Sequence, residues 1–122
     1  MKAALGCLTL LLALLGGSFF YSAMMAKAAD DFSARSSELA NASGERRLAE
    51  ALKLTDEWKS KAFYFSLSIP HAELDRIESE LVRVSASAEA KNDGEFYIAV
   101  ALLSDAFEHI GRLYEVSLDN IL

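Results

Sequence analysis

The sequence is poor in the residues on which most recognisable sites depend. It has one cysteine, Cys7, and two histidines, His71 and His109. A single cysteine excludes a disulfide within the chain, a cysteine-rich metal site and haem attachment through Cys-x-x-Cys-His. There is also no Gly-x-Ser-x-Gly turn, no His-Glu-x-x-His motif and no phosphate-binding glycine loop. We therefore expect neither catalytic activity nor a cofactor.

Charge is absent from the first part of the chain. Residues 3–26 carry no charged side chain, and no acidic residue precedes Asp30, whereas the whole chain has a net charge of −6. The part that follows Lys27 is therefore strongly acidic. A nucleic-acid partner would require a basic face, and anionic headgroups attract basic residues. The composition argues against binding of nucleic acid and against electrostatic docking on lipid.

The uncharged stretch over residues 3–26 is long enough to cross a bilayer, since about 20 apolar residues suffice. Near its end, Phe19, Phe20 and Tyr21 would lie at the outer interface, where aromatic rings are favoured. Lys2 and the amino terminus would stay inside, which places the acidic part outside the cytoplasm. We expect a single-pass protein of the cell membrane with an extracytoplasmic C-terminal domain, in which lipid contacts the N-terminal helix.

A cleaved export signal is the alternative interpretation of the same stretch. Ala26-Lys27-Ala28 fits a small-x-small cleavage site, and Gly16-Gly17 could end a shorter apolar core. However, residues 19–25 are too apolar for the polar segment that precedes such a site. The uncleaved anchor is favoured, and cleavage after Ala28 with export of the remainder is kept as the alternative.

Apolar side chains recur at steps of three and four residues beyond the anchor, which predicts helices. Residues 30–41 can continue the first helix, with Phe32, Ser36 and Leu39 on one stripe. Further helices are expected from Glu45 to about Phe65, from His71 to Lys91 and from the Asn92–Glu95 turn to the C-terminus. The expected inward positions are Leu48, Leu52, Thr55, Trp58, Ala62, Phe65, Leu74, Ile77, Leu81, Val84, Ala88, Phe96, Ala99, Leu103, Phe107 or Ala106, Ile110, Leu113, Tyr114 and Ser117.

The predicted fold is all-α. Short connections between long helices favour antiparallel neighbours, and no stretch alternates with the period of two that strands require. We expect a transmembrane or signal helix followed by an antiparallel up-down bundle of three long helices, with the anchor extension as a candidate fourth. The expected division is an anchor or signal segment over residues 1–28, a membrane-proximal helix or linker over 29–43, and the bundle over 44–122.

Two groups of residues are candidate sites. His71, Asp75 and Glu78 share one helix face, a spacing that could ligate a divalent metal. The simpler interpretation is that they are solvated side chains, so no metal is expected. Phe63 and Tyr64 lie off the apolar stripe, and exposed aromatic rings would mark a surface for a partner.

Several short motifs occur in an order that resembles a known family. Trp58 lies in a long helix and is followed by His71-x-Glu73-Leu74-Asp75-x-Ile77, Leu81-x-Arg83, Glu108-His109-Ile110 and Leu118-x-x-Asn120-Ile121. The chain is similar to a domain-of-unknown-function family of small bacterial proteins of clostridial type, the one numbered forty-three sixty-three. The resemblance implies a helical envelope protein with one N-terminal membrane segment and no established activity. Its motif positions here are Trp58, His71, Glu73, Asp75, Arg83 and Asn120.

The expected function is structural or one of protein interaction. An anchored, acidic helical bundle without catalytic motifs suits a protein that binds another envelope or membrane protein. The alternative is an extracytoplasmic module that binds a ligand or metal through His71, Asp75 and Glu78.

Overall fold

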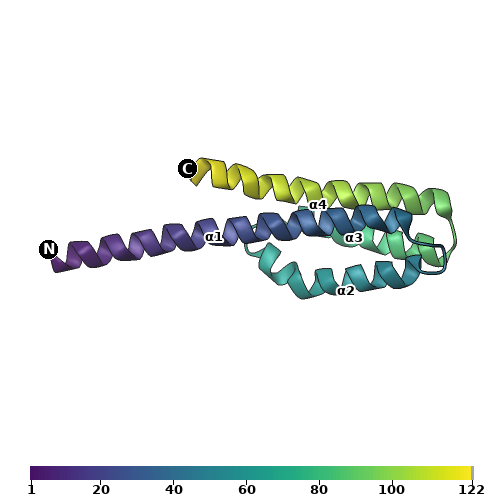
Figure 1. The fold of residues 1–122 in the computed structure, drawn as a ribbon, viewed down its shortest axis with the longest axis horizontal. Coiled ribbons are helices and arrows are strands. Elements are labelled where there is room, and N and C mark those ends of the chain that lie inside the picture. The colour runs from purple at the N-terminus through teal and green to yellow at the C-terminus, as the bar shows by residue number, and fades with distance from the viewer. Residues whose placement is uncertain (122) are drawn as a thin grey trace.

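The fold consists of helices joined by short connections. The structure is a computed structural model that describes residues 1–121, and of residues 117 and 119–121 it describes the backbone alone. The inward position predicted for Ser117 therefore has a side chain outside the described residues. The elements are α1 (Lys2–Glu38), the 3-10 turn η1 (Leu39–Asn41), α2 (Arg47–Ser66), α3 (His71–Glu89) and α4 (Asp93–Ile121) (Figure 1). No strand occurs within residues 1–121. The predicted all-α fold is confirmed.

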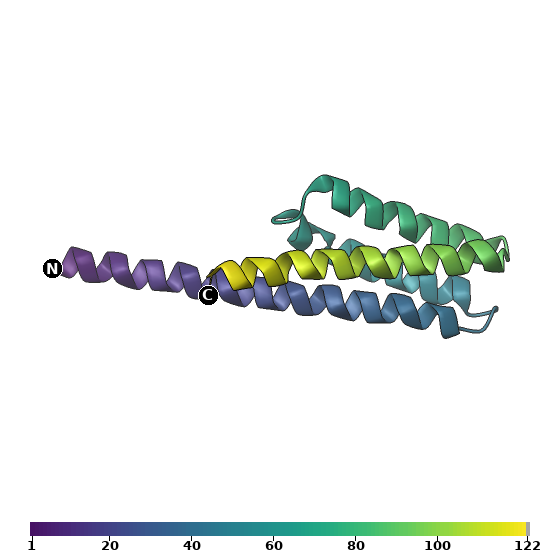
Figure 2. The same cartoon turned by 90° about the horizontal axis from the view of Figure 1, so that it is seen from above.

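The helices form an up-down bundle with antiparallel neighbours. The C-terminal half of α1 packs along α4, α3 packs on α4, and α2 packs on α3. The N-terminal half of α1 projects beyond the bundle, from the end at which α4 finishes and α2 turns into α3 (Figures 1 and 2). We call this the proximal end. The α1–α2 and α3–α4 connections lie at the opposite, distal end.

One continuous helix, α1, serves two different environments. Residues 1–20 are all exposed, whereas Met25, Ala29, Phe32 and Ser36 are buried against the bundle. The stripe predicted for residues 30–41 is therefore confirmed, and this part of α1 is the fourth helix of the bundle.

Aromatic rings from three helices fill the centre of the bundle. Phe32 of α1 stacks on Phe107 of α4 with ring centroids 5.1 Å apart, and Trp58 stacks on Phe65 within α2, also at 5.1 Å. Phe32 meets Trp58 edge to face at 5.6 Å. All four side chains are almost fully buried. We call these residues the ring cluster, and they bridge α1 and α2, whose backbones have little direct contact.

The inward face of α2 differs from the prediction. Leu52 is 49% exposed, and the buried positions before Trp58 are Ala51 and Leu54. The predicted stripe reached Trp58 through Leu52 and Thr55, and the observed one reaches it through Ala51 and Leu54. The last step satisfies helical spacing in both, because Leu54 lies four residues before Trp58 and Thr55 three. Ala51 lies seven residues before Trp58, close to two full turns, and so shares its buried face, whereas Leu52 lies at the edge of that face.

The α3–α4 connection was predicted correctly. The Asn92 side-chain oxygen accepts a hydrogen bond from the Glu95 backbone N–H at 3.1 Å, which caps the start of α4. The preceding residue, Lys91, has φ of 55°. This left-handed residue ends α3, and the Asn92 N–H reaches back to the Ser87 carbonyl at 3.0 Å.

Gly111 sets the close approach of α4 to α1. A Cβ at this position would lie 3.1 Å from the Asp30 carboxylate and 3.5 Å from the Ala29 Cβ.

Asp30 is exposed and can move, so Gly111→Ala should be tolerated, with a gain in helix propensity of about 0.5–1 kcal/mol to offset the contact. Gly111→Leu should lower the free energy of unfolding by about 1–3 kcal/mol because it separates the two helices. Urea unfolding of the two variants measures both effects, and equal stability would contradict the close approach.

Candidate functional site

A hydrogen-bonded cluster joins three segments at the proximal end. The Tyr21 hydroxyl of α1 donates to the Tyr64 backbone carbonyl at 2.6 Å and lies 3.0 Å from the Ser68 hydroxyl. The Ser68 hydroxyl in turn lies 2.6 Å from the Tyr114 hydroxyl of α4. The cluster therefore fixes the α2–α3 turn to the same level as Tyr21. Sequence reasoning missed it, because its members are distant in the chain and belong to no local pattern.

Tyr114 is the buried member of this cluster. Burial raises the pKa of its phenol from 10.0 to about 12, although the hydrogen bond with Ser68 opposes the increase. A raised pKa in the folded state means that the neutral phenol contributes stability below about pH 10. This contribution disappears as the pH rises through about 12.

We expect the free energy of unfolding to fall by about 2 kcal/mol between about pH 10 and about pH 12 because of Tyr114. The Tyr114→Phe variant has no phenol to ionise at this position, so its stability should depend less on pH over the same range. Urea midpoints of both proteins across this range measure the difference, and the other titrating groups are common to both. Parallel curves would contradict the assignment.

Exposed apolar side chains surround the Tyr21–Ser68–Tyr114 cluster. Phe63 and Leu67, next to the α2–α3 turn, are 67% and 63% exposed, and Tyr64 is about half exposed. On α1, Phe20 is 69% exposed. The two predicted interaction residues, Phe63 and Tyr64, are thus both on the surface, and Leu67 is a third member that the sequence did not single out.

The candidate metal ligands do not form a cluster. His71, Asp75 and Glu78 are each exposed on α3. Within the part of the chain that the structure describes, no group of three or more His, Cys, Asp or Glu side chains is placed to hold a metal ion.

Other positions of the family motif make structural contacts. Glu73 at the start of α3 lies 3.5 Å from the His109 Nε2 of α4. Arg83 pairs with Glu80 of the same helix and with Glu95 of α4, and these carboxylates raise the pKa of its guanidinium. Both contacts join α3 to α4.

Two motif positions stand apart from these ion pairs. Trp58 belongs to the ring cluster, and its indole Nε1–H has no hydrogen-bond acceptor among the described residues. Asn120 lies in the last turn of α4, and its side chain is outside the described residues.

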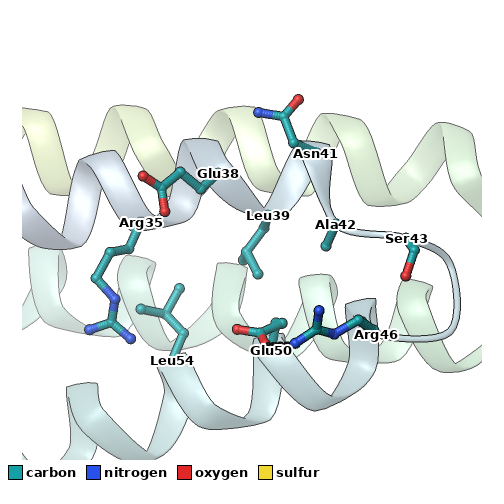
Figure 3. Close-up of a pocket in the computed structure, with 9 residues that line it drawn as sticks. All are labelled: Arg35, Glu38, Leu39, Asn41, Ala42, Ser43, Arg46, Glu50 and Leu54. Carbon is teal, nitrogen blue, oxygen red and sulfur yellow. Dashed lines mark ion pairs between the residues drawn. The ribbon is translucent and has the colours of Figure 1, made fainter.

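A polar cavity of about 340 Å³ opens between α1 and α2 near the distal end (Figure 3). Its two cationic side chains are Arg35, which projects from α1 towards α2, and Arg46, which lies beside Glu50. Arg35 pairs with Glu57, and Arg46 lies 3.7 Å from the Glu50 carboxylate. Because each guanidinium already faces a carboxylate, the cavity has little positive charge to offer an anion.

A more apolar cavity of about 480 Å³ lies between α2 and α3. The exposed side chains of Leu52 and Val82 form part of its lining, with Trp58 and Leu81 beneath them. The charged residues of its lining are Lys59, Glu78 and Glu89. Its exposed apolar side chains suit the packing of another apolar surface.

The N-terminal half of α1 is the remaining feature that has no partner in the fold. By length and composition this helix can cross a membrane, and none of the apolar window is buried within the bundle. A core helix of a soluble protein passes the same test but is mostly buried, so that explanation does not apply here. A membrane anchor and a signal segment remain as the two explanations.

Comparison with known proteins identifies a family. Neither the curated proteins nor the solved structures gave a match to the chain. A family model described as a domain of unknown function matches residues 19–121. The match starts next to Tyr21 and extends to the end of α4, and so includes the whole bundle. The chain therefore belongs to the family described as Domain of unknown function (DUF4363).

Proposed function

We propose that the chain is a single-pass membrane protein whose helical bundle stands outside the cytoplasm and has a structural or protein-interaction role. The observation that carries this proposal is the continuity of α1. Its residues 3–20 are exposed, uncharged and mostly apolar, while the same helix supplies Met25, Ala29 and Phe32 to the core. Exposure of so long an apolar helix to water is costly, and a bilayer removes that cost.

The burial pattern also supports anchoring over cleavage. A cut after Ala28 would remove the buried residues Ser22, Met25 and Ala26, together with Tyr21 and its hydrogen bonds. The half of α4 that contains Ile110 and Tyr114 would lose the helix that covers it. A cleavage site is normally placed outside the folded domain, and Ala28 is inside it.

The interaction role is supported by the apolar groove between α2 and α3. Leu52 and Val82 are 49% and 67% exposed, and they lie on the same side of the bundle. We propose that another envelope or membrane protein packs on this groove. No observation favours the alternative of a metal-binding module.

The anchor is tested on the full-length protein in cell membranes. We expect the protein to resist extraction by alkaline carbonate. Its intact mass should include residues 1–28, and protease added outside the cell should digest the bundle. Release of the protein by carbonate, an intact mass that corresponds to a chain starting at Ala29, or protection of the bundle from external protease would each overturn the proposal.

The interaction role is tested with a photocrosslinking residue in place of Val82. Crosslinking to a protein in intact cells is expected from this position. The matched control is the exposed Ala101 of α4, which lies beside Ser37 and Tyr97, away from the groove. Equal crosslinking from both positions, or none from Val82, would contradict a partner at the groove.

A further inference from the structure

The proximal end of the bundle carries an exposed segment without charge. Residues 63–70, which we call the tip, run from the last turn of α2 through the α2–α3 connection. Phe63, Tyr64 and Leu67 are its exposed apolar side chains, whereas Phe65 and Ile69 point into the core. Three large apolar groups thus face outward at one end of an otherwise acidic bundle.

Hydrogen bonds fix the height of the tip relative to α1. The Tyr21 hydroxyl binds the Tyr64 carbonyl at 2.6 Å and lies 3.0 Å from the Ser68 hydroxyl, so the tip is held beside Tyr21. Tyr21 directly follows the fully exposed residues 1–20, and its neighbour Phe20 is 69% exposed. There is no linker between the apolar part of α1 and the bundle. The tip is therefore at the level at which the exposed apolar part of α1 joins the bundle.

The distal connections have the opposite composition. The α1–α2 connection contains Glu45 and Arg46, and the α3–α4 connection contains Lys91 and Asn92. Both lie at the end away from the projecting half of α1 (Figures 1 and 2). Only the α2–α3 connection, on the side of the apolar helix, is uncharged, and it carries the exposed Leu67 next to the exposed aromatic residues Phe63 and Tyr64 at the end of α2. This asymmetry matches a molecule that has one end in contact with a membrane.

We propose that the tip binds the lipid bilayer, with Phe63, Tyr64 and Leu67 inserted at the boundary between the headgroups and the acyl chains. The inference rests on the proposed function, because it requires α1 to span the bilayer. Aromatic rings are favoured in this layer, and Tyr can place its ring in it while its hydroxyl stays hydrated. The bundle would then be attached to the bilayer at two points, through α1 and through the tip.

A bilayer fits the tip better than a protein partner does. With Tyr21 at the membrane surface, the last turns of α4, which continue past the tip beside α1 (Figure 1), and lipid occupy the space beneath the tip, so another protein would have to enter among them. The tip has no charge, so insertion does not require anionic lipid and is compatible with an acidic bundle. Lys59 and Lys61 are exposed on α2 just before the tip.

Depth-dependent fluorescence quenching tests the inference on the full-length chain in phosphatidylcholine vesicles. In a Cys7→Ala background, a single cysteine at Leu67 is labelled with an environment-sensitive dye, and spin-labelled lipid is the quencher. Phe20→Cys reports on the anchor. Val82→Cys is the matched control, since Val82 is 67% and Leu67 is 63% exposed. We expect quenching at Leu67 to approach that at Phe20 and to exceed that at Val82 by about twofold or more.

The outcomes separate the inference from the proposed function. Quenching at Phe20 but not at Leu67 would overturn tip insertion and leave the anchor in place. Absence of quenching at Phe20 would overturn both. Phe63→Cys provides a second probe of the tip that removes no buried contact, and it should give the same result as Leu67→Cys. An unquenched Phe63 probe would also contradict the inference.

Discussion

A fragment that begins at Ala29 is expected to be much less stable than one that begins at Tyr21. The shorter fragment lacks the side chains of Met25 and Ala26, which are buried against α4. It also lacks the Tyr21 hydroxyl, which ties the α2–α3 turn to α1. The loss of one buried Met alone costs about 2–5 kcal/mol, so the free energy of unfolding should fall by at least about 3 kcal/mol. Urea unfolding followed by circular dichroism measures the difference.

The fragment from Tyr21 is the control, because it omits only the exposed residues 1–20. It should keep the unfolding midpoint of the full-length bundle measured in detergent. Equal midpoints for the fragments that begin at Tyr21 and at Ala29 would mean that residues 21–28 add nothing to the bundle. Cleavage after Ala28 would then be compatible with the fold.

Trp58→Ala is expected to reduce the free energy of unfolding by about 3–5 kcal/mol. Small domains have about 5–15 kcal/mol in total, so this change alone approaches global unfolding. The indole contacts rings of three other residues, Phe32, Phe65 and Phe107, and it is fully buried. Its removal would leave a cavity between α1 and α2, which have few other contacts. Thermal and urea unfolding of the fragment from Tyr21 measure the effect.

Two companion variants distinguish the ring cluster from general effects on α2. Leu52→Ala lies in the same helix but is half exposed, so it should cost less than about 1 kcal/mol. Trp58→Phe keeps an aromatic ring and removes the unpaired Nε1–H, and should cost less than Trp58→Ala. A Trp58→Ala protein as stable as Leu52→Ala would contradict a central role for the cluster.

Local patterns were sufficient to predict most of the fold. The three- and four-residue spacing gave the helices, and Pro70 and Asn92 gave the boundaries between α2, α3 and α4. The inward face of α2 was not predictable in the same way. Thr55 and Leu54 lie three and four residues before Trp58, so a single helical step does not choose between them, but over two turns Ala51, seven residues before Trp58, lies closer to the Trp58 face than Leu52, six residues before it. Leu113 differs from expectation for a related reason, since it lies at the edge of the buried stripe of α4 and is partly exposed.

The candidate surfaces were less predictable than the fold. Phe63 and Tyr64 could be identified as off the apolar stripe, because their angular position depends on α2 alone. The contacts of Tyr21 with the α2–α3 turn, and of Glu73 with His109, join residues that are far apart in the chain. They depend on the vertical register between helices, which periodicity does not specify. The contacts at the proximal end therefore could not be predicted without the relative positions of the four helices.

The unbroken course of α1 has a mechanical consequence. Because no hinge separates residues 1–20 from the packed residues that follow, the two parts share one rotation and one tilt. One residue inserted near Gly17 would turn the bundle by about 100° relative to the inner half of the helix and shift it by about 1.5 Å along the axis. In the proposed arrangement, in which residues 1–20 cross a bilayer, a change in bilayer thickness that tilts the helix would likewise tilt the whole bundle. The orientation of the bundle is thus fixed by the orientation of residues 1–20.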